Sequence, residues 1–212
     1  MDAARIDEAF RVDALASFSH EVRTPVTAVR MVLDLATRTD EGGKTLDAEL
    51  VGLLETSLAE LSQLLEDLQD FSRAERGRVA FDAAPARLAD VVLEANRAAG
   101  ERLRITLDAP PGLSGTWDAE RLSSALAHLA AGVDRMGDVG GVVRGTAVAG
   151  PGSVTLVLES GAPGGPELPP GPPVAAFSYF AAGAVIAAMG GSFATERGQS
   201  YCRLSLRLPR GT

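Results

Sequence analysis

Two stretches near the start of the chain repeat core-type positions at alternating steps of three and four residues. This spacing is typical of helices with one apolar face, and it predicts long helices over residues 8–38 and 46–75. The stretch TRTDEGGKT between them is a turn signal, so we expect an antiparallel helical hairpin. The seam positions are Leu15, Phe18, Val22, Pro25, Val29 and Val32 in the first helix, and Leu50, Leu54, Ser57, Leu61, Leu64, Leu68 and Phe71 in the second.

A single hairpin with two strong seams cannot bury both of them by itself. Pairing with a second copy of the chain into a four-helix bundle buries them. The pattern therefore predicts a homodimer.

The pattern changes after Gly77, where short alternating segments are interleaved with helical ones. We predict an α+β fold: residues 1–77 form the hairpin, and residues 78–212 form an α/β sandwich with helices on one face of a mixed sheet. GAPGGPELPPGPP (161–173) lacks periodicity and predicts a loop. The predicted strands are 79–82, 103–110, 139–149, 153–160, 191–196 and 200–208, and the predicted helices are 86–100, about 118–136 with Asp118 as N-cap, and about 175–189.

Charge and composition exclude several functions. The chain has 20 basic and 28 acidic side chains, which disfavours the phosphate contacts that dominate nucleic-acid binding. Its single cysteine, Cys202, allows no internal disulfide and is expected to be a buried strand residue. The charged N-terminus lacks a secretory signal, and the apolar stretch 174–189 is short for a membrane span. We expect a cytoplasmic protein with no membrane contact.

Candidate chemistry gathers around His20 on the first helix. The seam uses Phe18, Val22 and Pro25, which places His20 on the opposite, exposed side. An imidazole in water is largely neutral above pH of about 6.5, which leaves a nucleophilic nitrogen. Thr24 lies one turn further on the same face, and the neighbouring Glu21 can hydrogen-bond one ring nitrogen and raise the basicity of the other.

The segment Ser-His-Glu-Val-Arg-Thr-Pro (19–25), followed by Val-Thr-Ala-Val, resembles the phosphoacceptor box of the HisKA family of sensor histidine kinases. LSQLLEDLQDFSRAERG (61–77) resembles the second helix of that family. The resemblance implies that His20 accepts a phosphoryl group, that Glu21 serves as base, and that Thr24 assists dephosphorylation of the partner. It also implies receiver domains of response regulators as partners, together with an upstream hybrid histidine kinase.

A receiver is expected to dock on the exposed stripe that continues below His20. The stripe consists of Arg23, Thr27, Met31 and Asp34, at steps of three and four residues. Met31 suits an adaptable apolar contact with a receiver helix, although an ordinary bundle position explains it equally well.

The second module resembles, in order and length, the ATP-binding domain of such kinases, but the residues that would hold the nucleotide differ. His128 and Gly132 stand where the family carries two asparagines for Mg-ATP, and glycine offers no ligand. Glu-Ser-Gly (159–161) replaces the adenine-recognising Asp-x-Gly. Aromatic residues within 176–180 stand where a glycine-rich turn would cradle phosphates. We therefore expect no cofactor and no metal on this chain, with Mg²⁺ needed only by the partner receiver.

Three functions remain open on these residues. The first is a histidine phosphotransferase that carries phosphate on His20 without binding ATP. The second is an ATP-dependent sensor-type histidine kinase with a divergent catalytic domain, which an intact acceptor box favours. The third is a non-catalytic pseudokinase scaffold, in which replacing His20 by alanine leaves signalling unchanged.

Overall fold

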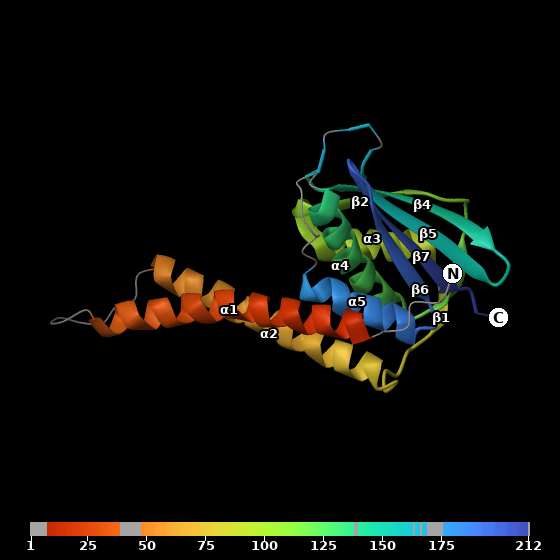
Figure 1. Cartoon of the computed structure of the whole chain (residues 1–212). Coiled ribbons are helices and arrows are strands. Elements are labelled where there is room, and N and C mark those ends of the chain that lie inside the picture. Colours follow the sequence, from red (N-terminus) through yellow and green to blue (C-terminus); the bar gives the residue numbers. More distant parts are fainter. Residues whose placement is uncertain are drawn as a thin grey trace.

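The computed structural model of the chain describes residues 8–38, 48–137, 140–162, 164–165, 167–168 and 176–211. A long helical hairpin projects from a compact α/β module (Figure 1). The helices are α1 (Glu8–Arg38), α2 (Ala48–Glu75), α3 (Leu88–Ala99), the short 3₁₀ helix η1 (Gly100–Arg102), α4 (Ala119–Gly137) and α5 (Phe177–Ala188). The strands are β1 (Ala84–Arg87), β2 (Arg104–Asp108), β3 (Ser114–Trp117), β4 (Val142–Gly150), β5 (Ser153–Gly161), β6 (Ser192–Arg197) and β7 (Tyr201–Pro209).

The predicted hairpin is confirmed. Where α1 and α2 face each other, Pro25 and Val32 of α1 are buried, as are Leu64 and Phe71 of α2. The predicted turn at 37–45 lies largely outside the described residues. Because each helix keeps one buried row, the two helices stay packed along much of their length.

The second module is built on a five-stranded mixed sheet of order β2-β4-β5-β7-β6. Strands β2 and β4 run parallel, and the other pairs are antiparallel. The predicted hairpin of β4 and β5 is present, with its turn at Pro151 and Gly152, where Gly152 has a φ of 66°. Helices α3, α4 and α5 lie on one face of this sheet (Figure 1). The fold class predicted from the sequence is therefore confirmed.

One continuous core lies between the sheet and these helices. Alternate strand residues such as Leu156, Leu158 and Leu204 are fully buried against Leu122 and Leu126 of α4. The cap of α4 is the predicted one, because Asp118 accepts a hydrogen bond from the amide of Arg121 at 3.1 Å. Cys202 is buried on β7, and burial raises its thiol pKa to about 11, as befits a structural residue.

Helix α5 belongs to the second module and also packs on the hairpin. One side of α5 joins the sheet core through Tyr179, Ala182 and Ile186. Its other side enters a second apolar cluster with both hairpin helices. This cluster, called the α5 dock below, contains buried Ala14, Leu64, Phe71, Ala74, Phe177, Ala181 and Ala184, with Phe10, Phe18, Val22, Leu68, Val79, Phe180 and Ala188 at its margin.

The strand predicted at 79–82 is wrong. Those residues have no regular structure, and the first strand is β1, whose Ala84 pairs antiparallel with Trp117 of β3. The amide of Asp82 instead donates to the carboxylate of Asp118 at 3.1 Å, which ties this segment to the start of α4. Strand β3 was not predicted because its sequence, SGTW, does not alternate.

The predicted loop at 161–173 lies mostly outside the described residues. Among the described helices, none combines the length and apolarity that a membrane span requires.

Candidate functional site

His20 lies on the exposed face of α1, as the seam pattern predicts. Thr24, one turn further along, is exposed as well. None of the described residues forms a hydrogen bond with the His20 ring. The imidazole is therefore open to a partner that approaches α1 from solvent.

Glu21 is turned toward the second module. Its Oε1 atom accepts a hydrogen bond from the hydroxyl of Ser17 at 2.8 Å and a second one from the backbone amide of Phe177 at 2.7 Å. Phe177 is the first residue of α5, and the preceding Ala176 contributes no side-chain cap. The carboxylate of Glu21 thus caps α5 from another part of the chain. Sequence reasoning placed Glu21 beside His20 and missed this contact, which joins residues 156 positions apart.

The predicted docking stripe is exposed along its whole length. Arg23, Thr27 and Asp34 are exposed, and Met31 keeps 50% of its accessible surface. The hydroxyl of Thr27 donates to the backbone carbonyl of Arg23 at 2.7 Å, which directs it along its own helix. The second module packs beside the other end of α1, so this stripe stays uncovered (Figure 1).

The aromatic residues of α5 take up two positions that the sequence singled out. A Cβ atom built at Gly132 would lie 2.4 Å from Cδ2 of Tyr179, so the tyrosine ring occupies the space beside this glycine. Tyr179 is 5% exposed, its hydroxyl is hydrogen-bonded to Thr195, and burial raises its pKa to about 12. Phe177 packs against the hairpin, with its ring centroid 5.0 Å from that of Phe18.

Glu159 lies on the face of the sheet that the helices do not cover. On β5, Leu158 and Ser160 are buried in the core, so the side chain between them points to the opposite face. There the Glu159 carboxylate meets Arg203 of β7 at 3.3 Å.

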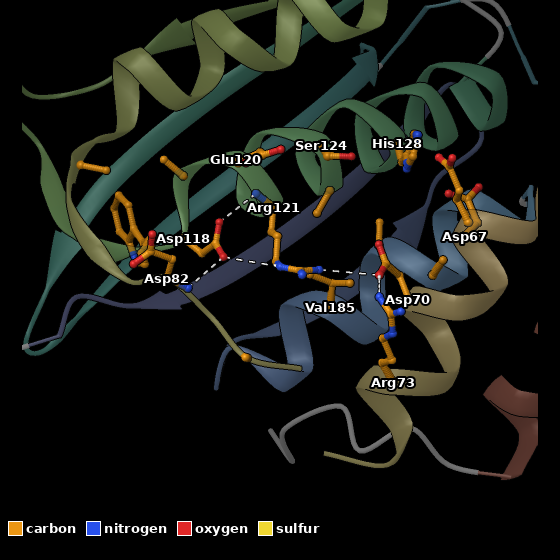
Figure 2. Close-up of a pocket in the computed structure, with 18 of the residues that line it drawn as sticks. Asp67, Asp70, Arg73, Asp82, Asp118, Glu120, Arg121, Ser124, His128 and Val185 are labelled. Carbon is orange, nitrogen blue, oxygen red and sulfur yellow. Dashed lines mark hydrogen bonds and ion pairs between the residues drawn. The ribbon is translucent and has the colours of Figure 1, made fainter. Parts of the chain in front are cut away.

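A cleft of about 740 Å³ lies between α2 and α4 of the second module. Figure 2 shows Arg121 reaching from α4 across this cleft toward Asp70 of α2. The two side chains are 3.6 Å apart, and Arg121 also lies 3.5 Å from Asp118. This ion pair is a further link between the hairpin and the second module.

Asp67 of α2 and His128 of α4 lie near one another at the cleft in Figure 2, with no hydrogen bond or ion pair between them. Asp67 is only 6% exposed, and its burial raises the pKa of its carboxyl, while His128 and a hydrogen bond from Gln63 oppose that rise. His128 therefore faces the hairpin in this structure. Among the described residues, no group of three or more acidic, histidine or cysteine side chains could hold a metal ion.

Comparison with protein families and curated proteins identifies the hairpin. Residues 10–77 match the His Kinase A (phospho-acceptor) domain. The signal transduction histidine-protein kinase BaeS of Escherichia coli (strain K12) is 28% identical over 163 residues, covering 74% of this chain and 34% of BaeS. The alginate biosynthesis sensor protein KinB of Pseudomonas aeruginosa is 31% identical over 107 residues, covering 49% of this chain and 18% of KinB. The chain thus spans about a third or less of these relatives.

Solved structures show the same fold. Histidine kinase AdeS of Acinetobacter baumannii matches with a TM-score of 0.74 at 20% identity, over 90% of this chain and 98% of that chain. Histidine kinase ThkA, solved in complex with the response regulator protein TrrA, matches with a TM-score of 0.61 at 17% identity, over 92% of this chain and 60% of that chain. Residues 10–77 therefore match a His Kinase A domain, and over most of its length the chain is similar in sequence to the histidine-protein kinase BaeS.

Proposed function

We propose that this chain carries phosphoryl groups on His20 to and from receiver-domain aspartates, and that it does so without using ATP. The hairpin, placed at residues 1–77, supplies the phosphoacceptor, and residues 78–212 form an ATPase-like module that has lost its nucleotide site. The observation that carries the second half of this proposal is the Tyr179 ring at Gly132.

Gly132 matters because the sensor histidine kinases that the second module resembles are expected to carry an asparagine at this position. With the tyrosine ring 2.4 Å from the site of a Cβ atom, no side chain fits beside it unless Tyr179 moves. Tyr179 is held by burial and by its bond to Thr195, so moving it disrupts the core. A magnesium ion that depends on an oxygen ligand at this point finds none.

Glu159 supports the same conclusion at the adenine position. Its carboxylate points away from the helices and is paired with Arg203 on the outer face of the sheet. A base bound between the sheet and the helices would therefore not meet it.

The proposed reaction needs only the exposed histidine and a phosphorylated partner. One ring nitrogen of His20 attacks phosphorus and forms the P–N bond, while the P–O bond to the receiver aspartate breaks and the aspartate leaves as carboxylate. The proton on the other ring nitrogen passes to Glu21 or to water. Mg²⁺ on the receiver screens the phosphoryl oxygens, and the reverse step returns the group to a second receiver. Thr24 is positioned on the same face to assist loss of phosphate to water.

A homodimer is supported by the surface that the hairpin leaves uncovered. Val51, Leu58 and Leu65 repeat every seven residues along α2 and are 38%, 48% and 55% exposed. Val26 and Leu33 of α1 are exposed to a similar extent. A second copy that covers these rows completes a four-helix bundle.

The receiver is proposed to dock on Arg23, Thr27, Met31 and Asp34. These residues are exposed and lie beyond the reach of α5. ThkA, whose fold is similar, was solved with a response regulator protein, which supports a partner of this class. An upstream hybrid histidine kinase would supply the first phosphorylated receiver.

An ATP-dependent histidine kinase is the second candidate, and the comparisons with known proteins favour it. The similarity to BaeS covers 74% of the chain, so it extends well past residues 10–77 into the second module. In that case the aromatic side chains of α5 move aside when nucleotide enters. A scaffold that only dimerises and docks receivers is the third candidate, and it does not need His20.

One experiment separates the three. The purified chain is incubated with γ-labelled ATP and Mg²⁺, and separately with a labelled phospho-receiver, beside a His20→Ala control. Label from the receiver alone supports the phosphotransferase, whereas label from ATP overturns the proposed loss of nucleotide binding. Label from neither source, with signalling retained in His20→Ala, leaves the scaffold.

A further inference from the structure

We propose that Ser17 and the backbone amide of Phe177 are positioning groups that hold the Glu21 carboxylate away from His20 while α5 is docked. Docking of the second module then lowers the reactivity of the phosphoacceptor. This inference rests on the proposed role of His20 and assigns the ATPase-like module a task at the same site.

One oxygen atom of the Glu21 carboxylate accepts both hydrogen bonds. Both donors, at 2.8 Å and 2.7 Å, bond to Oε1 of Glu21, one from the preceding turn of α1 and one from the first residue of α5. His20 directly precedes Glu21 on the helix but is not among these donors. The carboxylate therefore faces the junction between the modules instead of the imidazole.

The contact is costly to break from the side of α5. Phe177 is fully buried, and Ala176 offers no side-chain cap, so without Glu21 the first amide of α5 would lose its hydrogen-bond partner in an apolar setting. The Phe177 ring is also packed against Phe18 and Phe71, at centroid distances of 5.0 Å and 5.7 Å. Release of Glu21 thus goes together with loosening of the α5 dock.

The captured carboxylate is badly placed to take a proton from His20. Its two hydrogen bonds direct it toward Ser17 and α5, away from the histidine ring. Once released, it can take the proton from one ring nitrogen while the other attacks phosphorus. Loss of either donor should therefore speed phosphorylation of His20, which is opposite to the effect of simple structural damage.

Potassium phosphoramidate is a suitable probe because it needs neither nucleotide nor receiver. A ring nitrogen of His20 forms the P–N bond, the P–N bond of the donor breaks, and its nitrogen leaves as ammonia with a proton from water. The rate of phosphohistidine formation in the full chain is followed by intact mass spectrometry and ³¹P NMR at fixed pH.

Ser17→Ala removes one donor without touching the second module. We expect phosphohistidine to form about tenfold faster than in the wild type, the scale set by a hydrogen bond to a charged group. The matched control, Ser17→Thr, keeps a hydroxyl and should keep the wild-type rate. In a Glu21→Gln background, Ser17→Ala should change nothing, because the residue acts through the carboxylate.

A second pair of variants isolates the amide. Phe177→Ala and Phe177→Pro both remove the ring, but only proline removes the N–H. Proline suits this position, because it is the first residue of α5 and Ala176 already has the extended ψ of 155° that a following proline requires. We expect Phe177→Pro to react roughly threefold or more faster than Phe177→Ala.

The outcomes distinguish this inference from the proposed function. Absence of label at His20 in the wild type contradicts the phosphoacceptor role itself. Label at His20 with Ser17→Ala no faster than Ser17→Thr, or with an acceleration that persists in Glu21→Gln, overturns only the positioning role. Equal rates for the two Phe177 variants overturn the part assigned to α5.

Discussion

The hairpin has two apolar surfaces, and they differ in the kind of side chain that forms them. The surface covered by α5 places the rings of Phe10, Phe18 and Phe71 beside small Ala14 and Ala74. The aliphatic side chains of Leu64 and Leu68 complete it. The uncovered surface, formed by Val26 and Leu33 of α1 with Val51, Leu58 and Leu65 of α2, is aliphatic.

This difference matches two kinds of partner. Rings and alanines form an irregular surface that fits one helix closely, which suits an attachment within the same chain. Leucines and valines in regular rows suit the repeated packing of one helix against its copy. The contrast fits the proposal that one side of the hairpin holds its own second module and the other side receives a second chain.

The largest effect is expected from Leu58→Glu, which tests the uncovered surface. Two charges, one from each copy, would be buried in the proposed bundle, so association should weaken by about 100-fold or more. Sedimentation equilibrium measures it. Leu93→Glu is the matched control, because Leu93 is 51% exposed on α3, away from the hairpin, and should leave the dimer intact. A Leu58→Glu protein that stays fully dimeric would contradict the proposed interface.

Phe71→Ala tests the covered surface. Phe71 is nearly fully buried between α2 and α5, and truncation should lower the free energy of unfolding by about 3–4 kcal/mol. Urea unfolding followed by circular dichroism measures the loss. Phe71→Leu, which keeps most of the apolar volume, should lose less than half as much. Equal losses in both variants would mean that the ring itself is needed, and negligible losses would mean that the dock contributes little.

Met31→Asp tests the exposed docking stripe, which belongs to neither apolar surface. Transfer from a receiver domain that phosphorylates the wild type should slow by about tenfold, since an apolar contact is replaced by a charge. Sedimentation should still find a dimer. Unchanged transfer would exclude Met31 from the receiver contact.

The smallest effect is expected in the cleft beside α2, where burial raises the pKa of Asp67. A raised pKa means that the fold favours the protonated form, so the wild type loses stability as pH rises through that pKa. Asp67→Asn keeps an oxygen for Gln63 and removes the charge, so its melting temperature should exceed that of the wild type by about 2 °C at pH 7.5. The difference should vanish below the ordinary carboxyl pKa of 3.8. A melting-temperature difference between Asp67→Asn and the wild type that grows at acid pH would contradict the raised pKa of Asp67.

The sequence predicted most of the hairpin because helical periodicity is a local signal. The rows through Ser57, Leu64 and Phe71 and through Leu54, Leu61 and Leu68 are buried and half-buried, as expected. A third row, Val51, Leu58 and Leu65, was equally visible in the sequence but was not used. Counting three apolar rows on α2 would have separated the contact within the hairpin from the proposed contact between copies.

The contacts between modules could not be predicted in this way. The tertiary fold alone brings Asp70 to Arg121 and Glu21 to Phe177. No local spacing in the sequence predicts either contact. From the sequence, the aromatic residues of α5 were recognised as standing in place of a glycine-rich turn. In the structure, Tyr179 packs into the core beside Gly132, but Phe177 turns outward to the hairpin. Which way each ring points depends on the surface that receives it.

The cap that Glu21 provides to α5 makes the first turn of that helix conditional on a residue in another module. When the modules separate, this turn should fray, because its amides lose their acceptor. The hydrogen-exchange rate of the Phe177 amide therefore reports whether α5 is packed on α1. Slow exchange indicates that the two modules are in contact, and faster exchange indicates a larger fraction of molecules in which they are separated.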